Sequence, residues 1–214
     1  STPLYSSAAS DVYKRQELAP GTFVLVDQFV DRTFAREKSF FGPGLVAHVS
    51  MANPVCARLG DALEGVASEM GMGAVRNGTY LAMEGPQFST LAESNLYRTW
   101  GCDVIGMTNM PEAKLAREAE MCYATVAMVT DYDCWHPDHV NVEVTDVIRV
   151  LTENADRARD LVKIVADRLH HRPLACPHGC DRALDAALIT QPEARDSTMM
   201  RQLDAVAGRV LAGP

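Results

Sequence analysis

Strand-like and helix-like segments alternate along most of this chain, and that alternation restricts the possible folds more than any other feature. Apolar, β-rich runs typical of buried strands cover residues 22–29, 79–83, 103–107 and 122–129. Each run is followed by apolar residues at helical spacing or by helix-start signals, at residues 53–70, 90–100, from 111 onward and 146–170. The pattern predicts an α/β fold, with a central, largely parallel or mixed sheet flanked by helices.

Two of these helices carry clear start signals. Asn53 and Pro54 offer a cap and a first-turn proline, and Gly71 ends the apolar periodicity that follows. Thr90 with Glu93 three residues later forms a capping-box pattern. We therefore expect helices to begin next to residues 54 and 90.

The two ends of the chain differ from its middle. Residues 1–16 are small and polar without strand or helix periodicity, so we expect a leader that does not belong to the fold. Residues 17–190 are predicted to form one domain. Residues 191–214 are predicted to be a tail, preceded by a short helical stretch at 182–189.

Charge and composition exclude some classes of partner. The chain has 20 basic and 28 acidic side chains, a net charge of −8, and such a surface repels nucleic acid. No apolar run approaches the ~20 residues of a membrane helix. Six cysteines without a recognisable secretory leader predict a reduced, cytoplasmic protein.

Three segments at predicted strand ends are candidates for a ligand site, because ligands of open α/β sheets bind at the carboxyl ends of strands. They are residues 83–89, 106–109 and 130–135. Phe88 could lie against a flat base, or it could pack in the core. Asp131 and Asp133 project to the same side of an extended segment and could share a proton, or they could belong to a polar turn.

These segments resemble the methylthioadenosine-type purine nucleoside phosphorylases, in order and at that family's spacing. The resemblance extends from about residue 17 to residue 169. It rests on the motifs EGPQFS (84–89), AES (92–94), RTWG (98–101), DVIGMT (103–108), TDYDCW (130–135) and DQFVDRT (27–33).

The resemblance implies a nucleoside phosphorylase-like fold and a pentosyltransferase, a glycosyltransferase that cleaves 5′-methylthioadenosine with inorganic phosphate. It implies no organic cofactor and no metal. It also implies purine and methionine salvage, a small-molecule nucleoside substrate, and a homotrimer.

By this resemblance, individual positions take roles at the base. Asp131 hydrogen-bonds N7 of the purine and supports its departure, and Asp133 holds the 6-amino group. Phe88 stacks near the purine and ribose, while Ser89 and the loop that begins at Thr130 read the base. Related enzymes for 6-oxo purines resemble this chain less well, since they carry Glu and Asn where Ser89 and Asp131 stand.

The same resemblance implies roles for other positions at the sugar and the phosphate. Met107 packs beneath the ribose and Thr108 reaches the phosphate. Val142 and Val144 line the pocket for the 5′-methylthio group. A neighbouring subunit contributes His48.

One part of the family pattern is not found: the Gly-rich turn and Arg-His pair that bind phosphate do not precede residue 17. We therefore expect an N-terminally truncated fold with an exposed sheet edge and impaired turnover. Three alternatives remain open: a phosphorylase for adenosine, methylthioinosine or 6-oxo purines, a nucleosidase that uses water, and a non-catalytic nucleoside-binding or assembly protein.

Cys176 and Cys180, with His170 and His171 nearby, have a spacing found in zinc sites. No second cysteine pair at ligand spacing accompanies them, so the sequence favours a packed turn and no metal. His136 and His139 are likewise expected to be loop residues beside the substrate entrance.

Overall fold

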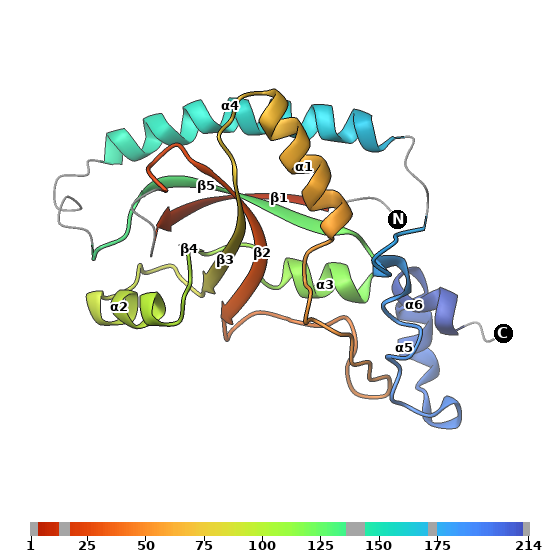
Figure 1. Ribbon diagram of the computed structural model, residues 1–214. Helices are drawn as coiled ribbons and strands as arrows, with labels where there is room; N and C mark the ends of the chain where they lie inside the picture. The colour runs from red at the N-terminus through yellow and green to blue at the C-terminus, as the bar shows by residue number, and fades with distance from the viewer. Residues whose placement is uncertain (1–3, 13–17, 136–143, 171–174, 212–214) are drawn as a thin grey trace.

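A closed sheet of five strands forms the centre of the molecule (Figure 1). The computed structural model describes residues 4–12, 18–135, 144–170 and 175–211. Around the barrel the strands follow the order β1-β4-β3-β2-β5. Their bounds are β1 Leu4–Val12, β2 Phe23–Arg32, β3 Val75–Met83, β4 Val104–Gly106 and β5 Tyr123–Tyr132.

The sheet is mixed. β2 with β3, β3 with β4 and β1 with β5 pair in parallel, whereas β2 with β5 and β1 with β4 pair antiparallel. Each strand predicted from the apolar runs is present, so the expected α/β class is confirmed. β5 runs against β2, which a wholly parallel sheet would not allow.

Residues 4–12 form strand β1, which the sequence did not predict. Leu4–Val12 pairs along its length with β5, from Leu4 opposite Tyr123 to Val12 opposite Tyr132, and its end pairs with β4. The sequence analysis missed this strand because it lacks apolar alternation. Its position is specified by backbone hydrogen bonds to two neighbouring strands. The expected exposed edge is also wrong, since β1 closes the described sheet. The leader and domain boundaries remain predictions.

Helices cover the sheet on two sides (Figure 1). α1 (Ala57–Glu69) and the long α4 (Val144–Leu169) lie on one side, and α2 (Leu91–Thr99) and α3 (Glu112–Glu118) lie on the other. The predicted capping box at Thr90 and Glu93 is confirmed, because each side chain bonds the backbone N–H of the other residue. No helix among the described residues is long and apolar enough to cross a membrane.

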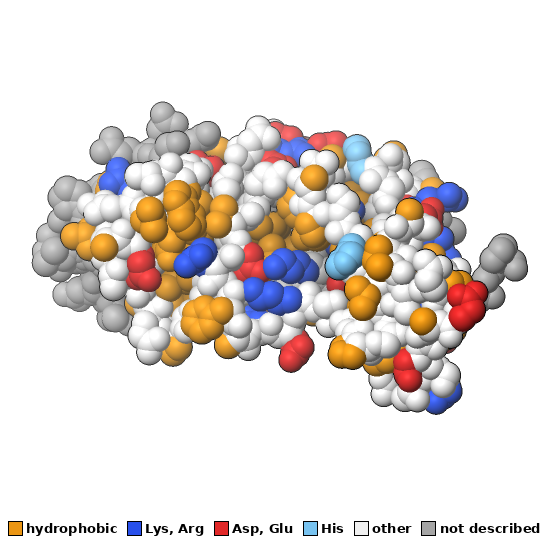
Figure 2. Space-filling view, turned by 90° about the horizontal axis from the view of Figure 1, so that it is seen from below, with side chains coloured by type: hydrophobic (Ala, Val, Ile, Leu, Met, Phe, Trp, Pro, Cys, Tyr) orange, Lys and Arg blue, Asp and Glu red, His pale blue; other side chains and the backbone are white. Residues whose placement is uncertain are grey.

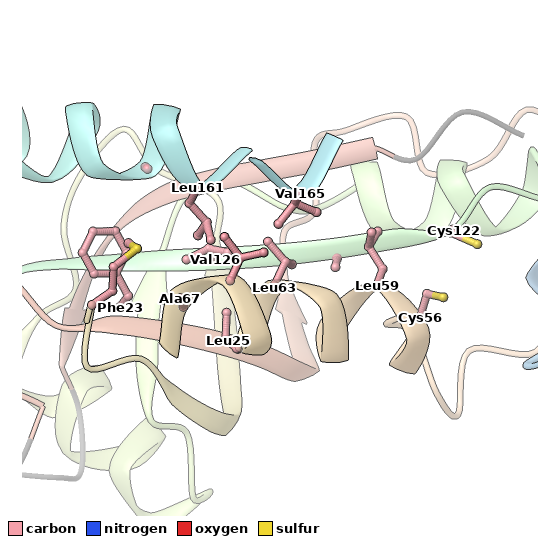
Figure 3. Close-up of a cluster of buried hydrophobic side chains, with 14 of the residues drawn as sticks. Phe23, Leu25, Cys56, Leu59, Leu63, Ala67, Cys122, Val126, Leu161 and Val165 are labelled. Carbon is pink, nitrogen blue, oxygen red and sulfur yellow. The ribbon is translucent and has the colours of Figure 1, made fainter. Parts of the chain in front are cut away.

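Alternate residues of β2 fill two separate cores. Phe23 and Leu25 face α1 and α4 (Figure 3), whereas Val24 and Val26 face the core on the α3 side. All four side chains are at most 2% exposed. Side chains alternate along a strand, so a strand buried on both faces is continuously apolar, and each such side chain contributes about 1.5–3 kcal/mol.

The C-terminal segment packs as a small helical subdomain. It contains η2 (Cys180–Arg182), η3 (Pro192–Ala194), α5 (Ser197–Gln202) and α6 (Asp204–Leu211). Leu203 of this segment joins Leu45 and Leu184 in a third apolar cluster. The helix predicted at 182–189 is replaced by the short η2 and turns.

Candidate functional site

The structure brings together the three segments that the sequence singled out. After β3 the chain turns at Gly85, whose φ is +74°. A Cβ at this glycine would lie 2.6 Å from Sδ of Met107, which follows β4. The positive φ favours glycine at this position, and a side chain here would displace the Met107 side chain.

The loop after β5 lies against the first turn of α2. Asp133 is only 5% exposed, and its Oδ2 accepts a hydrogen bond from the Ser94 hydroxyl. The Cys134 thiol donates to the carbonyl of Ser89 at 3.7 Å. Burial raises the pKa of that thiol, and the neighbouring carboxylate of Asp133 adds to the effect. These contacts join the acidic loop to the segment that carries Phe88 and Ser89.

Trp135 also holds this loop in place. The guanidinium of Arg98 stands 4.0 Å from the centre of its ring, and the ring packs on a cluster that includes Leu81 of β3. The prediction placed the three segments at one carboxyl edge of a parallel sheet. Because β5 runs against β2, the curl of the closed sheet and these side-chain contacts bring the loops together instead.

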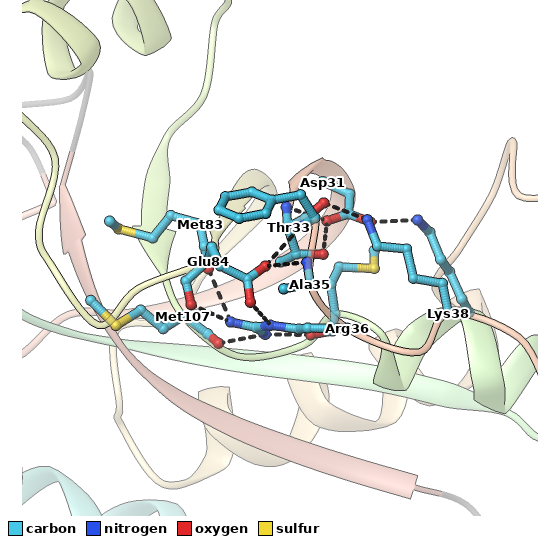
Figure 4. A network of polar contacts seen from close by, with 11 residues as sticks. Asp31, Thr33, Ala35, Arg36, Lys38, Met83, Glu84 and Met107 are labelled. Atoms are coloured by element: carbon cyan, nitrogen blue, oxygen red, sulfur yellow. Dashed lines mark hydrogen bonds and ion pairs between the residues drawn. The ribbon is translucent and has the colours of Figure 1, made fainter.

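Arg36 and Glu84 hold the ends of β3 and β4 in place (Figure 4). The Arg36 guanidinium donates to the carbonyls of Glu84 at 2.7 Å and Met107 at 2.8 Å. Glu84 accepts the backbone N–H groups of Phe34 and Ala35. The hydrogen bond from the backbone N–H of Phe34, and then the contact with Arg36, lower the pKa of the Glu84 carboxyl.

A second polar network stands beside the first (Figure 4). The carboxylate of Asp31, whose side chain is 12% exposed, forms ion pairs with Lys114 and Lys38. It also accepts hydrogen bonds from the hydroxyl and the backbone N–H of Thr33. Burial raises the pKa of Asp31, but the hydrogen bonds from Lys114, Thr33 and Lys38 outweigh it and hold that pKa well below its usual range. The sequence analysis did not predict this network, because Asp31 and Lys114 are distant along the chain.

The predicted aromatic and phosphate-reading residues are accessible. Phe88 is 77% exposed, so the core-packing alternative for it is wrong. Figure 2 shows hydrophobic side chains gathered on one face of the molecule. The exposed large hydrophobic residues in and next to α2 include Phe88, Leu91, Leu96 and Trp100. Thr108 is exposed, and its hydroxyl lies 3.2 Å from that of Tyr80.

Asp131 is partly buried at the end of β5. The hydroxyl of the buried Thr130 donates to its Oδ1 at 3.1 Å. The main chain of Asp131 pairs with Asp11 of β1. The carboxylate is thus held next to the loop that contains Asp133.

Not every predicted position joins this group. His48 is exposed and lines two cavities elsewhere in the chain, of 860 and 390 Å³. The larger one is also lined by Gln28, Arg117 and His178. Val144 opens α4, but its side chain is outside the described part of the structure. Val142, His136, His139 and His171 lie outside the described residues as well.

A cluster of cysteines that the sequence analysis did not predict lies at the N-terminal end of α1. The sulfur atoms of four buried cysteines all lie within 4.8 Å of one another; they belong to Cys56, Cys122, Cys176 and Cys180. The sequence showed only the Cys176 and Cys180 pair. Cys56 and Cys122 are distant in sequence, and their meeting depends on how α1 packs against β5.

Comparison with known proteins places the fold. The architecture, a curled mixed sheet between helices, is that of nucleoside phosphorylases. A structure of a methylthioadenosine phosphorylase from an Antarctic soil metagenomic library superposes with a TM-score of 0.87, at 41% identity over 94% of this chain and 70% of that one. A Schistosoma mansoni adenosine/methylthioadenosine phosphorylase mutant in complex with methylthioadenosine gives 0.75, at 30% identity over 85% of this chain and 68% of that one.

The sequence relationship is closer still. The chain belongs to the phosphorylase superfamily, whose family model matches residues 14–167. Two relatives named S-methyl-5′-thioadenosine phosphorylase come from Rhodospirillum rubrum and Bradyrhizobium diazoefficiens. The first is 67% identical over 92% of this chain and 67% of its own length, and the second is 64% identical over 99% and 72%.

Proposed function

We propose that this chain carries out the phosphorolysis of 5′-methylthioadenosine to adenine and 5-methylthioribose 1-phosphate. One observation carries the proposal: contacts from Ser94 to Asp133 and from Cys134 to Ser89 unite the acidic loop with the segment that bears Phe88. Relatives with the name of this activity align over nearly the whole chain.

The chemistry explains why these residue types are needed. The bond between C1′ and N9 breaks through an oxocarbenium-like state, and a phosphate oxygen then bonds to C1′. The departing adenine becomes a good leaving group when N7 is protonated. We assign that role to Asp131, because a carboxyl group at this position can hydrogen-bond N7 as the family resemblance implies.

A second carboxylate suits a 6-amino purine. Asp133 is held by Ser94 through Oδ2, and we assign its other oxygen to the exocyclic amino group. A carboxylate only accepts hydrogen bonds, so it favours an amino group over a 6-oxo group. This is our reason to prefer methylthioadenosine to methylthioinosine and other 6-oxo purines as substrate.

The remaining roles follow the family resemblance. Phe88 covers the base and ribose, Ser89 and Thr130 support base recognition, and Met107 lies beneath the sugar. Thr108 receives inorganic phosphate, the co-substrate, and no organic cofactor takes part. Val142 and Val144 line the pocket for the methylthio group.

We also propose a homotrimer in which His48 reaches the site of a neighbouring subunit. Two facts support this role: His48 is exposed, and within its own chain it lines cavities that contain none of the other proposed site residues. We propose a cytoplasmic location and a place in purine and methionine salvage.

Product analysis tests the reaction. Purified protein is incubated with methylthioadenosine in phosphate buffer and in a phosphate-free buffer of the same pH, and the sugar product is identified by mass spectrometry. We expect 5-methylthioribose 1-phosphate, formed only with phosphate. Free methylthioribose at equal rates in both buffers would indicate a nucleosidase. Nucleoside binding without turnover would indicate a non-catalytic protein.

A further inference from the structure

Four cysteines from three separate parts of the chain meet at one buried point. Their exposed fractions are 1% for Cys56, 2% for Cys122, 7% for Cys176 and 2% for Cys180. None of them is in a disulfide. Four thiols facing one another in an apolar surrounding need an explanation, because free cysteines usually pack singly against hydrocarbon.

The backbone holds each cysteine in position. Cys56 is the N-cap residue of α1, and its N–H donates to the carbonyl of Tyr123, the residue after Cys122. Cys176 and Cys180 flank a tight turn in which the N–H of Gly179, at φ +68°, donates to the carbonyl of Cys176. The spacing of this pair, with three residues between, is that of a zinc-binding turn.

The sulfur separations fit a tetrahedral metal ion. Cys56 Sγ and Cys176 Sγ are 3.7 Å apart, and every pair is within 4.8 Å. Zinc–sulfur bonds of ~2.3 Å in a tetrahedron require sulfur atoms about 3.8 Å apart, whereas a disulfide requires about 2.05 Å. The cluster therefore has the dimensions of a four-thiolate zinc site.

Two arginines supply the charge balance that such a site requires. Zn²⁺ with four thiolates carries a net charge of −2, which is costly to bury alone. Arg58 Nη2 lies 3.4 Å from Cys122 Sγ, and Arg117 Nη1 lies 3.9 Å from Cys180 Sγ. N–H groups directed at ligating sulfur atoms are typical outer partners of metal sites.

We propose that Cys56, Cys122, Cys176 and Cys180 bind one structural zinc ion. Four protein ligands leave no open position, so the ion has no catalytic role. It fastens the C-terminal segment to the start of α1 and the start of β5. Cys180, Val55 and Ala57 also line the 860 Å³ cavity that contains His48, so the ion stabilises one wall of that cavity.

Metal analysis of the full chain, purified under reducing conditions, tests the site. We expect about one zinc per chain by plasma mass spectrometry. The variants Cys176→Ser and Cys180→Ser are expected to retain less than about one tenth of that zinc, because three thiolates bind it more weakly. Cys102→Ala is the matched control: Cys102 is equally buried but belongs to another cluster, so its zinc content should equal that of the wild type.

A second measurement keeps the test independent of how the variants fold. Wild-type protein stripped of metal is loaded with Co²⁺, and we expect sulfur-to-cobalt charge-transfer bands together with the intense visible bands of a tetrahedral ion. Zinc below about one tenth per chain without a cobalt spectrum would overturn the proposal. So would a disulfide among the four cysteines, found by alkylation and mass spectrometry without reductant, or iron in place of zinc.

Discussion

The guanidinium of Arg36 donates a hydrogen bond to the backbone carbonyl of Met107, 2.8 Å away, and so ties the loop after β2 to the loop after β4. The same side chain donates to the carbonyls of Met83 and Glu84 at the end of β3. No other type of side chain has donors in a planar fork that can satisfy carbonyls from two strands at once.

Replacing Arg36 tests this arrangement. In Arg36→Lys a single ammonium cannot reach all these carbonyls, so we expect a loss of about 1–3 kcal/mol in the free energy of unfolding. We also expect roughly a tenfold fall in kcat/KM for methylthioadenosine, because Met107 and Glu84 become less well positioned. Urea unfolding and steady-state kinetics measure both. Arg159→Lys, on the exposed face of α4, should change neither.

Gly85 offers a test with a closely matched control. Both Gly85 and Gly71 have positive φ, but a Cβ at Gly85 meets Met107 Sδ, whereas a Cβ at Gly71 meets nothing within 4 Å. Gly71→Ala should cost about 1 kcal/mol from backbone strain alone. Gly85→Ala should cost more and should raise KM for the nucleoside severalfold. Equal effects of the two changes on stability and KM would show that the contact with Met107 is unimportant.

Asp131→Asn tests the proposed leaving-group role. Loss of the carboxyl group removes support for protonation at N7, so kcat/KM for methylthioadenosine should fall by about 10²–10⁴. The loss should be larger for 6-amino than for 6-oxo purines, because related enzymes for 6-oxo purines carry Asn at this position; methylthioadenosine and methylthioinosine are measured in parallel. The same change at Asp156, exposed on α4, is the control. A uniform loss on both substrates would contradict the assignment.

Asp31 predicts how stability depends on pH. Its pKa in the folded protein lies below the ordinary value of 3.8, so the unfolded chain binds the proton more readily. The stabilisation is therefore complete above about pH 5 and is lost as the pH falls below 3.8 toward the pKa of the folded state. Asp31→Asn should lower the free energy of unfolding at pH 7. It should also make that free energy fall less steeply as the pH drops below about 5. Urea unfolding at several pH values measures this. The same steep decrease in stability at acid pH in the variant as in the wild type would contradict it.

Local signals predicted the strands and helices of the middle of the chain well. The apolar run at 22–29, the helix ending before Gly71 and the capping box at Thr90 all rest on neighbouring residues, and the structure has each of them. The segments around Phe88, Met107 and Asp131 were found because each lies at or just after the end of a predicted strand, but the closure of the sheet and contacts between the loops bring them together. Their roles in catalysis remain predictions.

The features that were missed depend on distant parts of the chain. Leu4–Val12 has no apolar alternation and becomes a strand because β5 and β4 offer hydrogen-bonding partners on both sides. α6 is fixed by Arg209, whose guanidinium binds Glu120 after α3. The cysteine cluster likewise requires α1, β5 and the C-terminal segment to be assembled first. No window of sequence contains this information.

The way the barrel closes has a consequence for how rapidly the molecule assembles. The pairing of β1 with β5 places Leu4 opposite Tyr123, so the hydrogen bonds that close the barrel link residues far apart along the polypeptide. Such non-local pairing has a large entropic cost before any contact compensates for it, and it is associated with slow folding. We therefore expect ring closure to be the late, rate-limiting event of refolding.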